Sequence, residues 1–423
     1  MAAFAKREFR TSKTSLKSKK MKNLLNLTFA GALFLMATSC NDSNSVTPNK
    51  QLQTIPTTFS DQSSEFAFDF LKKHNSEEKA DKNYFVSPLS LHVALGMLLN
   101  GADGKTKEEI QKGLRLSSDL TANNNIYKSL IESLPNSDPK VTNTIANSVW
   151  YRNSFTVEKS FLDVLKTSFN ATVSAEDFNN TATVGKINTW ASDNTNGKIK
   201  KVIEKIDPAQ VMFLMNALYF KGDWKIPFKV ENTRDENFVG TTGTKPVKMM
   251  SMLENVKYAK RTGYQALELA YGDGNYVMTI LLPDEKTPVF NVINIMSVTE
   301  WKSLNTALAE QKVIVGLPKF TLEYETNLNK VLENLGMPTM FSDAADLSKI
   351  SAPAGKIKVG FVKQNTFVAI DEKGTEAAAV TTIDIKLTSA PILPEFICNR
   401  PFAFFISEKQ SNTILFAGKI VNL

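Results

Sequence analysis

The sequence predicts an α+β fold built as a single domain. Apolar residues recur at helical spacing in several segments, as in the group Phe66, Phe70 and Leu71. Residues 211–220 are nearly all apolar, which suits a strand buried on both faces at the centre of a sheet. Division by typical domain size would split 423 residues into two or three domains. Helical and strand segments are intermixed and no internal repeat appears, so we interpret the folded part as one mixed domain.

The elements follow one another in a clear order along the chain. A strongly apolar helix begins after Ser87-Pro88 and ends at Asn100-Gly101. Pro318 interrupts a strand, and residues 272–275 mark a hairpin turn. The expected helices are 59 onward, 89–99, 106–114, 119–134, 158–169, 184–195, 299–308 and 328–336. The expected strands are 84–86, 141–151, 173–178, 211–220, a meander over 249–283, 313–323, 359–370, 402–406 and 414–421.

Residues 1–40 have the composition of an export signal, with Met21 as an alternative start. Charged residues precede an apolar run over 24–37, and small residues lead to Cys40. The run is too short to span a bilayer as a helix. A cysteine at this place resembles a bacterial lipoprotein processing site, where Cys40 would carry the lipid. We expect an exported lipoprotein on the outer membrane or cell surface of a bacterium, or secretion after cleavage near Ser39.

The charge of the chain is concentrated in this leader. The whole chain carries a formal charge of +7, and residues 1–40 alone account for all of it, so the remainder is neutral. A nucleic-acid-binding domain needs a basic face of its own, and the charge balance does not support one. Residues 41–58 are polar, include Pro48 and Pro56, and predict a tether between the leader and a domain over 59–423.

The residues that usually carry catalysis are scarce. His74 lies in a run of charged residues that predicts a solvated helix end, and His92 lies on an apolar helix, where a satisfied buried side chain is expected. A catalytic triad needs a histidine held by a carboxylate beside a serine, and no local motif indicates one. Cys398 precedes a predicted buried strand and is interpreted as an inert core thiol. The sequence therefore predicts no enzyme, no cofactor and no metal site.

A stretch of twenty residues, 371–390, follows the predicted strand at 366–370. Connections between strands are commonly about four to six residues long, so this one is unusual. Side chains alternate between the two faces of an extended chain. Uncharged residues share one face: Thr375, Ala377, Ala379, Thr381, Ile383, Ile385 and Leu387. The other face carries Glu376, Thr382, Asp384 and Lys386. The segment is thus patterned as a half-buried strand although it stands where a loop is expected.

The sequence EKGTEAAA at 372–379 resembles the hinge of the serpins, and other segments match that family in the same order. They are FVSPLS at 85–90, NALYFKGDW at 216–224, LPKF at 317–320, LGM at 335–337, NRPF at 399–402 and FAGK at 416–419. The chain is identified as a member of this family. The resemblance implies the serpin fold, with a large central mixed β-sheet, further sheets and about eight or nine helices, and an exposed reactive loop over 371–393.

The resemblance implies an inhibitor of serine-type endopeptidases that acts as a suicide substrate. A serine protease, or a cysteine protease, would cleave the loop and form an acyl-enzyme, after which the loop would insert into the central sheet. The alternative is a non-inhibitory surface protein of the same fold that binds a ligand or partner. The hinge in this resemblance comprises Glu372, Gly374, Thr375, Glu376, Ala377, Ala378 and Ala379. Its Thr375 and three alanines would not obstruct insertion, which favours the inhibitor. A monomer is expected, attached to a membrane only by its lipid.

Two counts place the cleaved bond differently. Seventeen residues counted from Glu372 end at Thr388, so the bond would join Thr388 and Ser389. Counting back from the NRPF segment places it after Ala390. We prefer the first count, because the length of the inserted strand decides how far the protease moves. Lys386 would suit a trypsin-like protease and Leu387 a chymotrypsin-like one, whereas Thr388 would suit elastase- or subtilisin-like enzymes.

Polar side chains are expected where the sheet opens. In the family, a serine after the Ser-Pro step, the asparagine of the central strand and a histidine on the strand before the loop share hydrogen bonds there. Ser87, Ser90 and Asn216 match, and Gln364 stands at the histidine position. Glutamine donates and accepts but does not titrate, so pH-triggered opening through it is not expected. Ordinary buried polar side chains would explain the same residues. Trp224 ends the central-strand motif at the top of the sheet.

Overall fold

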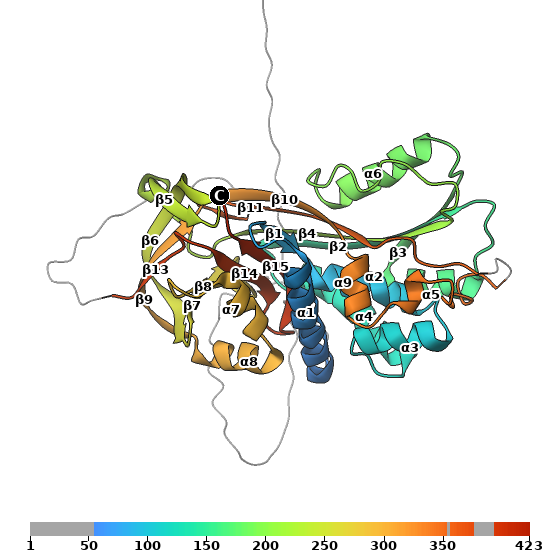
Figure 1. The fold of residues 1–423 in the computed structure, drawn as a ribbon, viewed down its shortest axis with the longest axis horizontal. Helices are drawn as coiled ribbons and strands as arrows, with labels where there is room; N and C mark the ends of the chain where they lie inside the picture. The colour runs from blue at the N-terminus through green and yellow to red at the C-terminus, as the bar shows by residue number, and fades with distance from the viewer. Residues whose placement is uncertain (1–54, 353–355, 376–392) are drawn as a thin grey trace, which may run out of the picture. The chain divides into compact units, whose positions relative to one another are not determined.

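The computed structural model describes residues 55–352, 356–375 and 393–423, and the fold is α+β as predicted (Figure 1). These residues include nine α-helices. They are α1 (Thr57–Glu77), α2 (Pro88–Leu99), α3 (Gly104–Gly113), α4 (Leu120–Ser133), α5 (Lys159–Phe169), α6 (Ala182–Asn194), α7 (Val289–Ile295), α8 (Val298–Ala307) and α9 (Asn329–Asn334). Three short 3-10 helices, at Leu134–Asn136, Val230–Asn232 and Thr339–Phe341, link some of the elements.

The largest sheet holds nine of the strands in the described ranges. Its order is β1-β15-β14-β8-β7-β6-β9-β13, with β5 paired to β6. The strands are β1 (Tyr84–Val86), β5 (Arg234–Gly240), β6 (Gly243–Arg261), β7 (Tyr264–Tyr271), β8 (Tyr276–Pro283), β9 (Ala309–Pro318), β13 (Glu395–Ile397), β14 (Phe402–Glu408) and β15 (Thr413–Ile420). Every residue of β8, β14 and β15 is buried, because these apolar strands are covered on both faces.

Two smaller sheets form a layer above it. One has the order β12-β4-β2-β3, with β2 (Val141–Arg152), β3 (Ala171–Glu176), β4 (Met212–Asp223) and β12 (Gly374–Thr375). The other pairs β10 (Phe320–Asn327) with β11 (Lys363–Ile370). Figure 1 shows β10, β11, β4 and β2 running side by side, with α6 on one face and α1, α2 and α9 on the other. We call the two sheets the four-stranded half and the two-stranded half.

Most predicted elements appear within a few residues of their expected bounds. The strand predicted at 211–220 is β4, and Pro318 separates β9 from β10 as expected. Several boundaries differ from those expected: the strand expected from residue 359 begins at Lys363, the meander expected from 249 begins at Gly243, and α1 begins at Thr57, inside the predicted tether. Pro56 places its carbonyl oxygen to accept from the amide of Phe59, which begins the helix two residues earlier. The strands β5 and β13 and the helix α7 were not anticipated from their sequences.

The prediction that His74 lies at a solvated helix end was wrong. Its side chain is buried, and its Nε2 lies 2.9 Å from the Tyr324 hydroxyl. Tyr84 packs edge-on against the imidazole, with ring centroids 4.9 Å apart. The charged residues around His74 in the sequence face solvent, but residues from β1 and β10 cover the histidine itself. Helical periodicity in a short charged run does not reveal such covering strands.

Candidate functional site

A tight turn joins β11 to β12 and brings the start of the predicted loop to the edge of β4. Asp371 and Gly374 exchange backbone hydrogen bonds of 3.0 and 3.3 Å, and the Asp371 carboxylate accepts from the amide of Lys373. Beyond the turn, Gly374 pairs with Asp223 and Thr375 with Gly222, antiparallel to β4. Residues 371–375 were expected in an exposed loop, but Glu372, Gly374 and Thr375 are buried. The chain at Thr375 is therefore already a strand directed between β11 and β4.

Only glycine fits at position 374. Its φ is +149°, a conformation that side chains disfavour. A Cβ there would lie 2.2 Å from the Gly222 carbonyl oxygen and 2.8 Å from the Trp224 amide nitrogen. Both atoms belong to the backbone and have little room to move. The glycine thus permits β12 to approach β4 closely enough to pair with it.

The carboxylate of Glu372 fixes this turn from the other side. It accepts hydrogen bonds from Lys319 at 2.9 Å and from Thr233 at 3.0 Å. The Glu372 carbonyl accepts from the amide of Phe228 at 2.8 Å. Burial raises the pKa of Glu372, but the hydrogen bonds from Lys319 and Thr233 outweigh it and leave the pKa below its usual value. The carboxylate is therefore ionised at neutral pH and ties the turn to the end of β9 and the segment before β5.

Trp224 lies where it was expected, at the end of β4, and it holds the same turn. Its amide donates to the Lys373 carbonyl and its Nε1 donates to the Asp371 carbonyl at 3.0 Å. The indole stacks on Tyr271, with ring centroids 4.4 Å apart. The Tyr271 hydroxyl in turn lies 2.9 Å from Thr375 Oγ1, so both side chains meet inside the fold. Thr375, a residue of the predicted hinge, is thus held in the interior and not on the surface.

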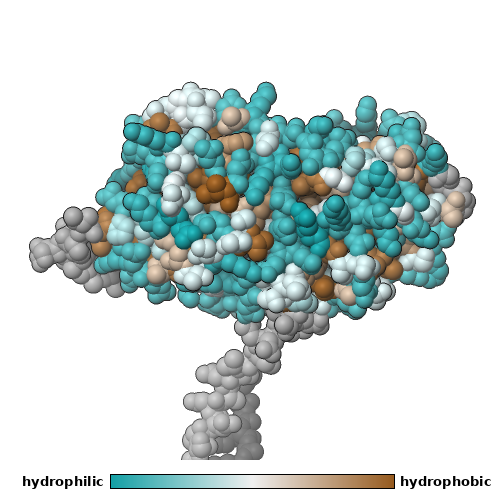
Figure 2. Space-filling view, turned by 60° about the horizontal axis from the view of Figure 1, so that its bottom comes forward, coloured by the Kyte–Doolittle hydropathy of each residue, from teal (hydrophilic) through white to brown (hydrophobic). Residues whose placement is uncertain are grey.

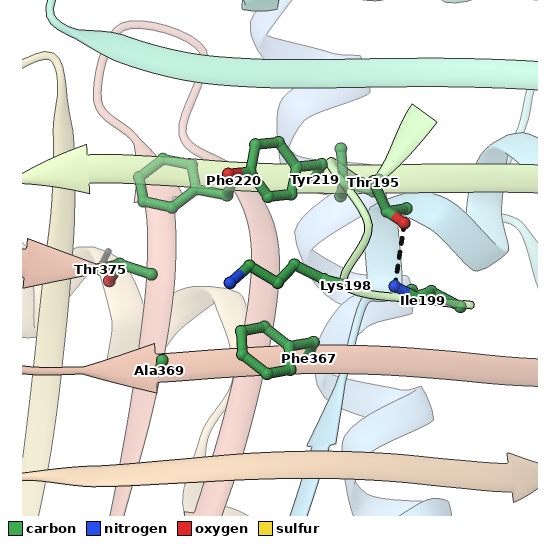
Figure 3. Close-up of a pocket in the computed structure, with 9 residues that line it drawn as sticks. Thr195, Lys198, Ile199, Tyr219, Phe220, Phe367, Ala369 and Thr375 are labelled. Carbon is green, nitrogen blue, oxygen red and sulfur yellow. Dashed lines mark hydrogen bonds between the residues drawn. The ribbon is translucent and has the colours of Figure 1, made fainter. Parts of the chain in front are cut away.

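An opening separates the two halves below Thr375. Residues from β4 and β11 line it together with the segment after α6, and it encloses about 20 Å³, roughly the room that one water needs (Figure 3). The lining residues are Thr195, Lys198, Ile199, Leu218, Tyr219, Phe220, Phe367, Ala369 and Thr375. The described residues of β4 and β11 belong to separate sheets. The opening thus continues the path on which β12 begins.

The polar residues expected at the opening come together only in part. Gln364 accepts from the Ser87 amide at 2.8 Å and donates to the Ser87 carbonyl at 2.9 Å. The Ser87 hydroxyl donates to the Leu415 carbonyl and accepts from the amide of Ser90. Ser90 contributes this amide and not its side chain. These contacts fix β11 to the beginning of α2.

Asn216 does not join that group in the described structure. Its side-chain amide donates to Asn147 Oδ1 at 2.7 Å, and Asn147 donates to the Phe169 carbonyl. The Asn216 Oδ1 is buried and accepts no hydrogen bond from the described residues. The expected sharing of hydrogen bonds between Asn216 and Gln364 is therefore wrong for this conformation, because the opening lies between β4 and β11.

Several predicted residues lie outside the described ranges, and others are buried in the core. The former include Cys40, the hinge residues 376–379 and the candidates for the cleaved bond, Lys386, Leu387, Thr388, Ser389 and Ala390. Cys398 is buried, and burial raises the pKa of its thiol. His92 is buried with both ring nitrogens near partners, Tyr127 Oη and the Leu114 carbonyl.

Where the chain is described, no three His, Cys, Asp or Glu side chains gather as metal ligands would. None of the described helices is both long and apolar enough to cross a bilayer.

Sequence reasoning missed the partners of the hinge. Lys319 lies in the LPKF segment that carried the resemblance, so its position was noted but its pairing with Glu372 was not. Tyr271 and Thr233 come from parts of the chain about 100 or more residues away from the hinge, as their separations of 104 and 139 residues show. No local pattern connects residues so distant in sequence.

Fold and site together define a class: an α+β protein whose strand layer is divided, with the first residues of a long connecting segment seated at the division. A family model described as Serpin (serine protease inhibitor) matches residues 61–423. The chain is 31% identical over 402 residues to a serpin-like protein of Thermococcus kodakarensis, across 90% of this chain and 92% of that protein. The chain therefore belongs to the serpin family.

Solved structures agree with this assignment. Tengpin, a thermophilic serpin solved in its native state, superposes with a TM-score of 0.80 and 32% identity, across 88% of this chain and 96% of tengpin. A thyroxine-binding globulin solved in complex with thyroxine gives a TM-score of 0.77 at 28% identity, across 86% of this chain and 98% of the other. The fold is thus shared with proteins whose names point to different roles.

Proposed function

We propose that this protein inhibits serine-type endopeptidases as a suicide substrate, by inserting its cleaved loop between β4 and β11. The observation that carries the proposal is the short strand β12, which follows β11 through a tight turn and already pairs with β4 at the opening. Thr375 pairs with Gly222 on β4, and Asp371 pairs with Gly374 across the turn from β11. Extended residue by residue, the two registers would place Ala378 opposite Tyr219 on β4 and opposite Phe367 on β11, and these two residues line the same opening. One inserted strand would therefore pair with both sides of the opening.

The protease carries out the bond cleavage in this mechanism. Its serine Oγ attacks the carbonyl carbon of Thr388, and the peptide bond to Ser389 breaks. The new amino group of Ser389 takes a proton, and an ester joins Thr388 to the protease. Cleavage frees the segment after Thr375 to continue along the path of β12. Insertion moves the ester-bound protease away from its starting place and distorts its active site before water completes hydrolysis. Before cleavage, the loop is held at both ends and the intact form persists kinetically.

The level of Asn216 supports the same proposal. Both registers place Thr381 opposite Asn216 on β4 and opposite Gln364 on β11. Alternation directs Thr381 to the same inner face as Thr375, where the Asn216 Oδ1 lacks a donor. A buried acceptor without a donor costs about 1–3 kcal/mol. On insertion, the Thr381 hydroxyl would donate a hydrogen bond to Asn216 Oδ1. The inserted loop would thus supply the hydrogen bond that this buried acceptor lacks.

Incubation of the protein with a panel of serine proteases tests the proposal. The panel contains elastase-, subtilisin-, trypsin- and chymotrypsin-like enzymes, with a cysteine protease as a further arm. We expect a complex that survives SDS with at least one enzyme. Mass spectrometry should show that the released peptide begins at Ser389. Heating intact and loop-cleaved protein side by side is the second measurement, and the cleaved form should melt well above the intact one. Cleavage without any stable complex, together with equal or lower melting temperature, would refute the mechanism.

The second candidate function is non-inhibitory binding of a ligand or partner. Its support is the similarity to thyroxine-binding globulin, which was solved with thyroxine. Against it stand the small residues Thr375, Ala377, Ala378 and Ala379, none of which would obstruct insertion. Figure 2 shows one face on which hydrophilic residues predominate and apolar ones are scattered. This face offers no broad apolar surface for a partner, in keeping with the proposal that the protein acts as a monomer.

The location of the protein is a separate proposal. The leader over 1–40 and the polar stretch after it support export with a lipid on Cys40, on the outer membrane or surface of a bacterium. Secretion after cleavage near Ser39 is the alternative. Mass spectrometry of the mature amino terminus distinguishes the two, since only the first gives a lipid-bearing Cys40. A chain that still begins at Met1 or Met21 would exclude both.

A further inference from the structure

A short segment after α6, residues 195–199, reverses the chain and brings Thr195, Lys198 and Ile199 to the opening. Asn196 and Gly197 both have positive φ, +50° and +75°. The Gly197 amide donates to the Ser192 carbonyl at 2.8 Å, and the Ile199 amide donates to Thr195 Oγ1 at 3.0 Å. Thr195 is itself tied to the helix through the Ala191 carbonyl. We call residues 195–199 the strap.

The strap is fastened to the four-stranded half. The Asn196 side chain donates to the Tyr219 hydroxyl on β4 at 3.2 Å. Farther along, Asn188 of α6 accepts from the amides of Val202 and Ile203 at 2.8 and 3.1 Å. These hydrogen bonds run to α6 and β4, so the strap would stay with that half if the opening widened.

One side chain of the strap reaches across to the two-stranded half. The ammonium group of Lys198 lies 5.0 Å from the ring centroid of Phe367 on β11, within the range of a cation–π contact. Figure 3 shows Lys198 extended between β4 and β11, with the Phe367 ring beside it and Thr375 farther along the same opening. Ile199 and Thr195 border the same space. Lys198 therefore bridges two halves that belong to separate sheets.

The registers identify what Lys198 obstructs. Counted from Thr375 along β4 and from Asp371 along β11, the residue that enters opposite both Tyr219 and Phe367 is the same one, Ala378. Phe367 is partly exposed on the face that the strap covers, while its neighbours Thr366 and Val368 are buried beneath. Lys198 thus lies over the place that a strand would take at this level.

We propose that Lys198 is a positioning residue of the insertion path: its contact with Phe367 holds the two halves together and slows entry of the loop. The inference rests on the proposed function and adds to it the side chain that sets the rate. A cation–π contact at a partly exposed site corresponds to about a two- to fivefold change in an equilibrium or rate. Loss of the contact should therefore speed insertion by about that factor.

The experiment uses the full mature protein and a synthetic peptide with the sequence of residues 375–386. Incorporation of the peptide into the intact protein is followed by native electrophoresis and by the rise in melting temperature that a filled opening gives. Lys198→Met removes the charge and keeps the length, whereas Lys198→Arg keeps a cation over the ring. Lys200→Met is the matched control, because Lys200 is exposed two residues farther along and does not line the opening. Phe367→Leu removes the ring from the other side.

We expect Lys198→Met and Phe367→Leu to take up the peptide about two- to fivefold faster than the parent, and Lys198→Arg and Lys200→Met to match it. The double variant should fall short of the sum of the two single effects, because both substitutions remove the same contact between Lys198 and Phe367. Equal rates in the parent and Lys198→Met, or equal acceleration by Lys200→Met, would overturn the inference. A parent that takes up no peptide would contradict the proposed function instead.

The melting temperature of the intact variants decides the inference in that case, since the contact exists before insertion. Lys198→Met and Phe367→Leu should then lower the midpoint non-additively, and Lys200→Met should leave it unchanged. Additive effects would overturn the role of the contact even if no peptide enters.

Discussion

Thr375 Oγ1 lies 2.9 Å from the hydroxyl of Tyr271, in the interior between the strand layer and the large sheet. Thr375 is the last described residue before 376–392, and it already pairs with Gly222 on β4. The hydroxyl pair and the Gly374 turn together determine the direction in which the following chain would run. The beginning of a new strand is thus present in the uncleaved protein.

Replacement of Thr375 by arginine should block inhibition without preventing cleavage. The side chain is 5% exposed, and an arginine there would place an unpaired charge beside Tyr271, at a cost of several kcal/mol. The strand β12 would then separate from β4, and the protease would cleave the loop as an ordinary substrate. Gel electrophoresis in SDS should show cleaved inhibitor and no complex. Thr375→Ser keeps the hydroxyl and should behave as the parent; rapid complex formation by Thr375→Arg would argue against strand insertion.

Replacement of Gly374 by alanine should separate β12 from β4. The new Cβ would meet backbone atoms at 2.2 to 2.8 Å, and the positive φ adds strain of about 1–3 kcal/mol. We expect a lower melting temperature of the intact protein and faster amide exchange at Thr375 and Trp224. Gly360→Ala is the control, because no atom lies within 4 Å of its added Cβ. Equal melting temperatures for both variants would contradict the close approach described for Gly374.

Replacement of Thr381 by valine should weaken the loop-cleaved form and leave the intact form unchanged. In the proposed inserted strand, the Thr381 hydroxyl donates to the buried Asn216 Oδ1, so valine would leave that acceptor unsatisfied, at about 1–3 kcal/mol. Differential scanning calorimetry of intact and cleaved samples measures the difference. Thr382→Val is the matched control, since alternation places Thr382 on the opposite face. If both variants melt alike after cleavage, the registers do not extend to this level.

Two buried histidines should make stability fall on mild acidification. Burial lowers the pKa of His74 to about 4, a change that Glu78 opposes and that Lys419 and Lys82 reinforce. Burial likewise lowers the pKa of His92 to about 4. Both groups titrate near 6.5 once unfolded, so the unfolded chain binds more protons and stability decreases as pH falls from about 6.5 towards 4. At pH 5, each histidine should lower the free energy of unfolding by on the order of 2 kcal/mol relative to pH 7.

Urea unfolding at pH 7, 6 and 5 measures this slope. The lowered pKa of the Glu372 carboxyl group takes effect mainly below its ordinary value of 4.5, and a histidine variant separates the contribution of one histidine from that of all other groups. His92→Gln should remove about half of the slope. A slope as steep in His92→Gln as in the parent would show that His92 is charged in the folded protein.

The sequence alone predicted most of the elements and assigned a hinge to residues 372–379. Local patterns can be recognised in a sequence without knowing which residues they contact in the fold. Three such patterns are the apolar run of β4, the glycine of the turn and the alternating segment after Thr375. The pairing of Gly374 and Thr375 with β4 could not be predicted in the same way, because it depends on how near Asp223 and Gly222 come to the end of β11. An exposed loop was expected there, and its first residues were found buried.

Only the tertiary structure decided which side chains meet across the opening. Asn216 and Gln364 were expected to share hydrogen bonds, but they lie on different halves, and Asn216 bonds to Asn147 instead. His74 was expected in solvent, but Tyr84 and Tyr324 cover it. The contact between Lys198 and Phe367 joins a turn after α6 to a strand far along the chain. Sequence periodicity describes what one element exposes, whereas a contact depends on the distance between two elements, and folding of the whole chain sets that distance.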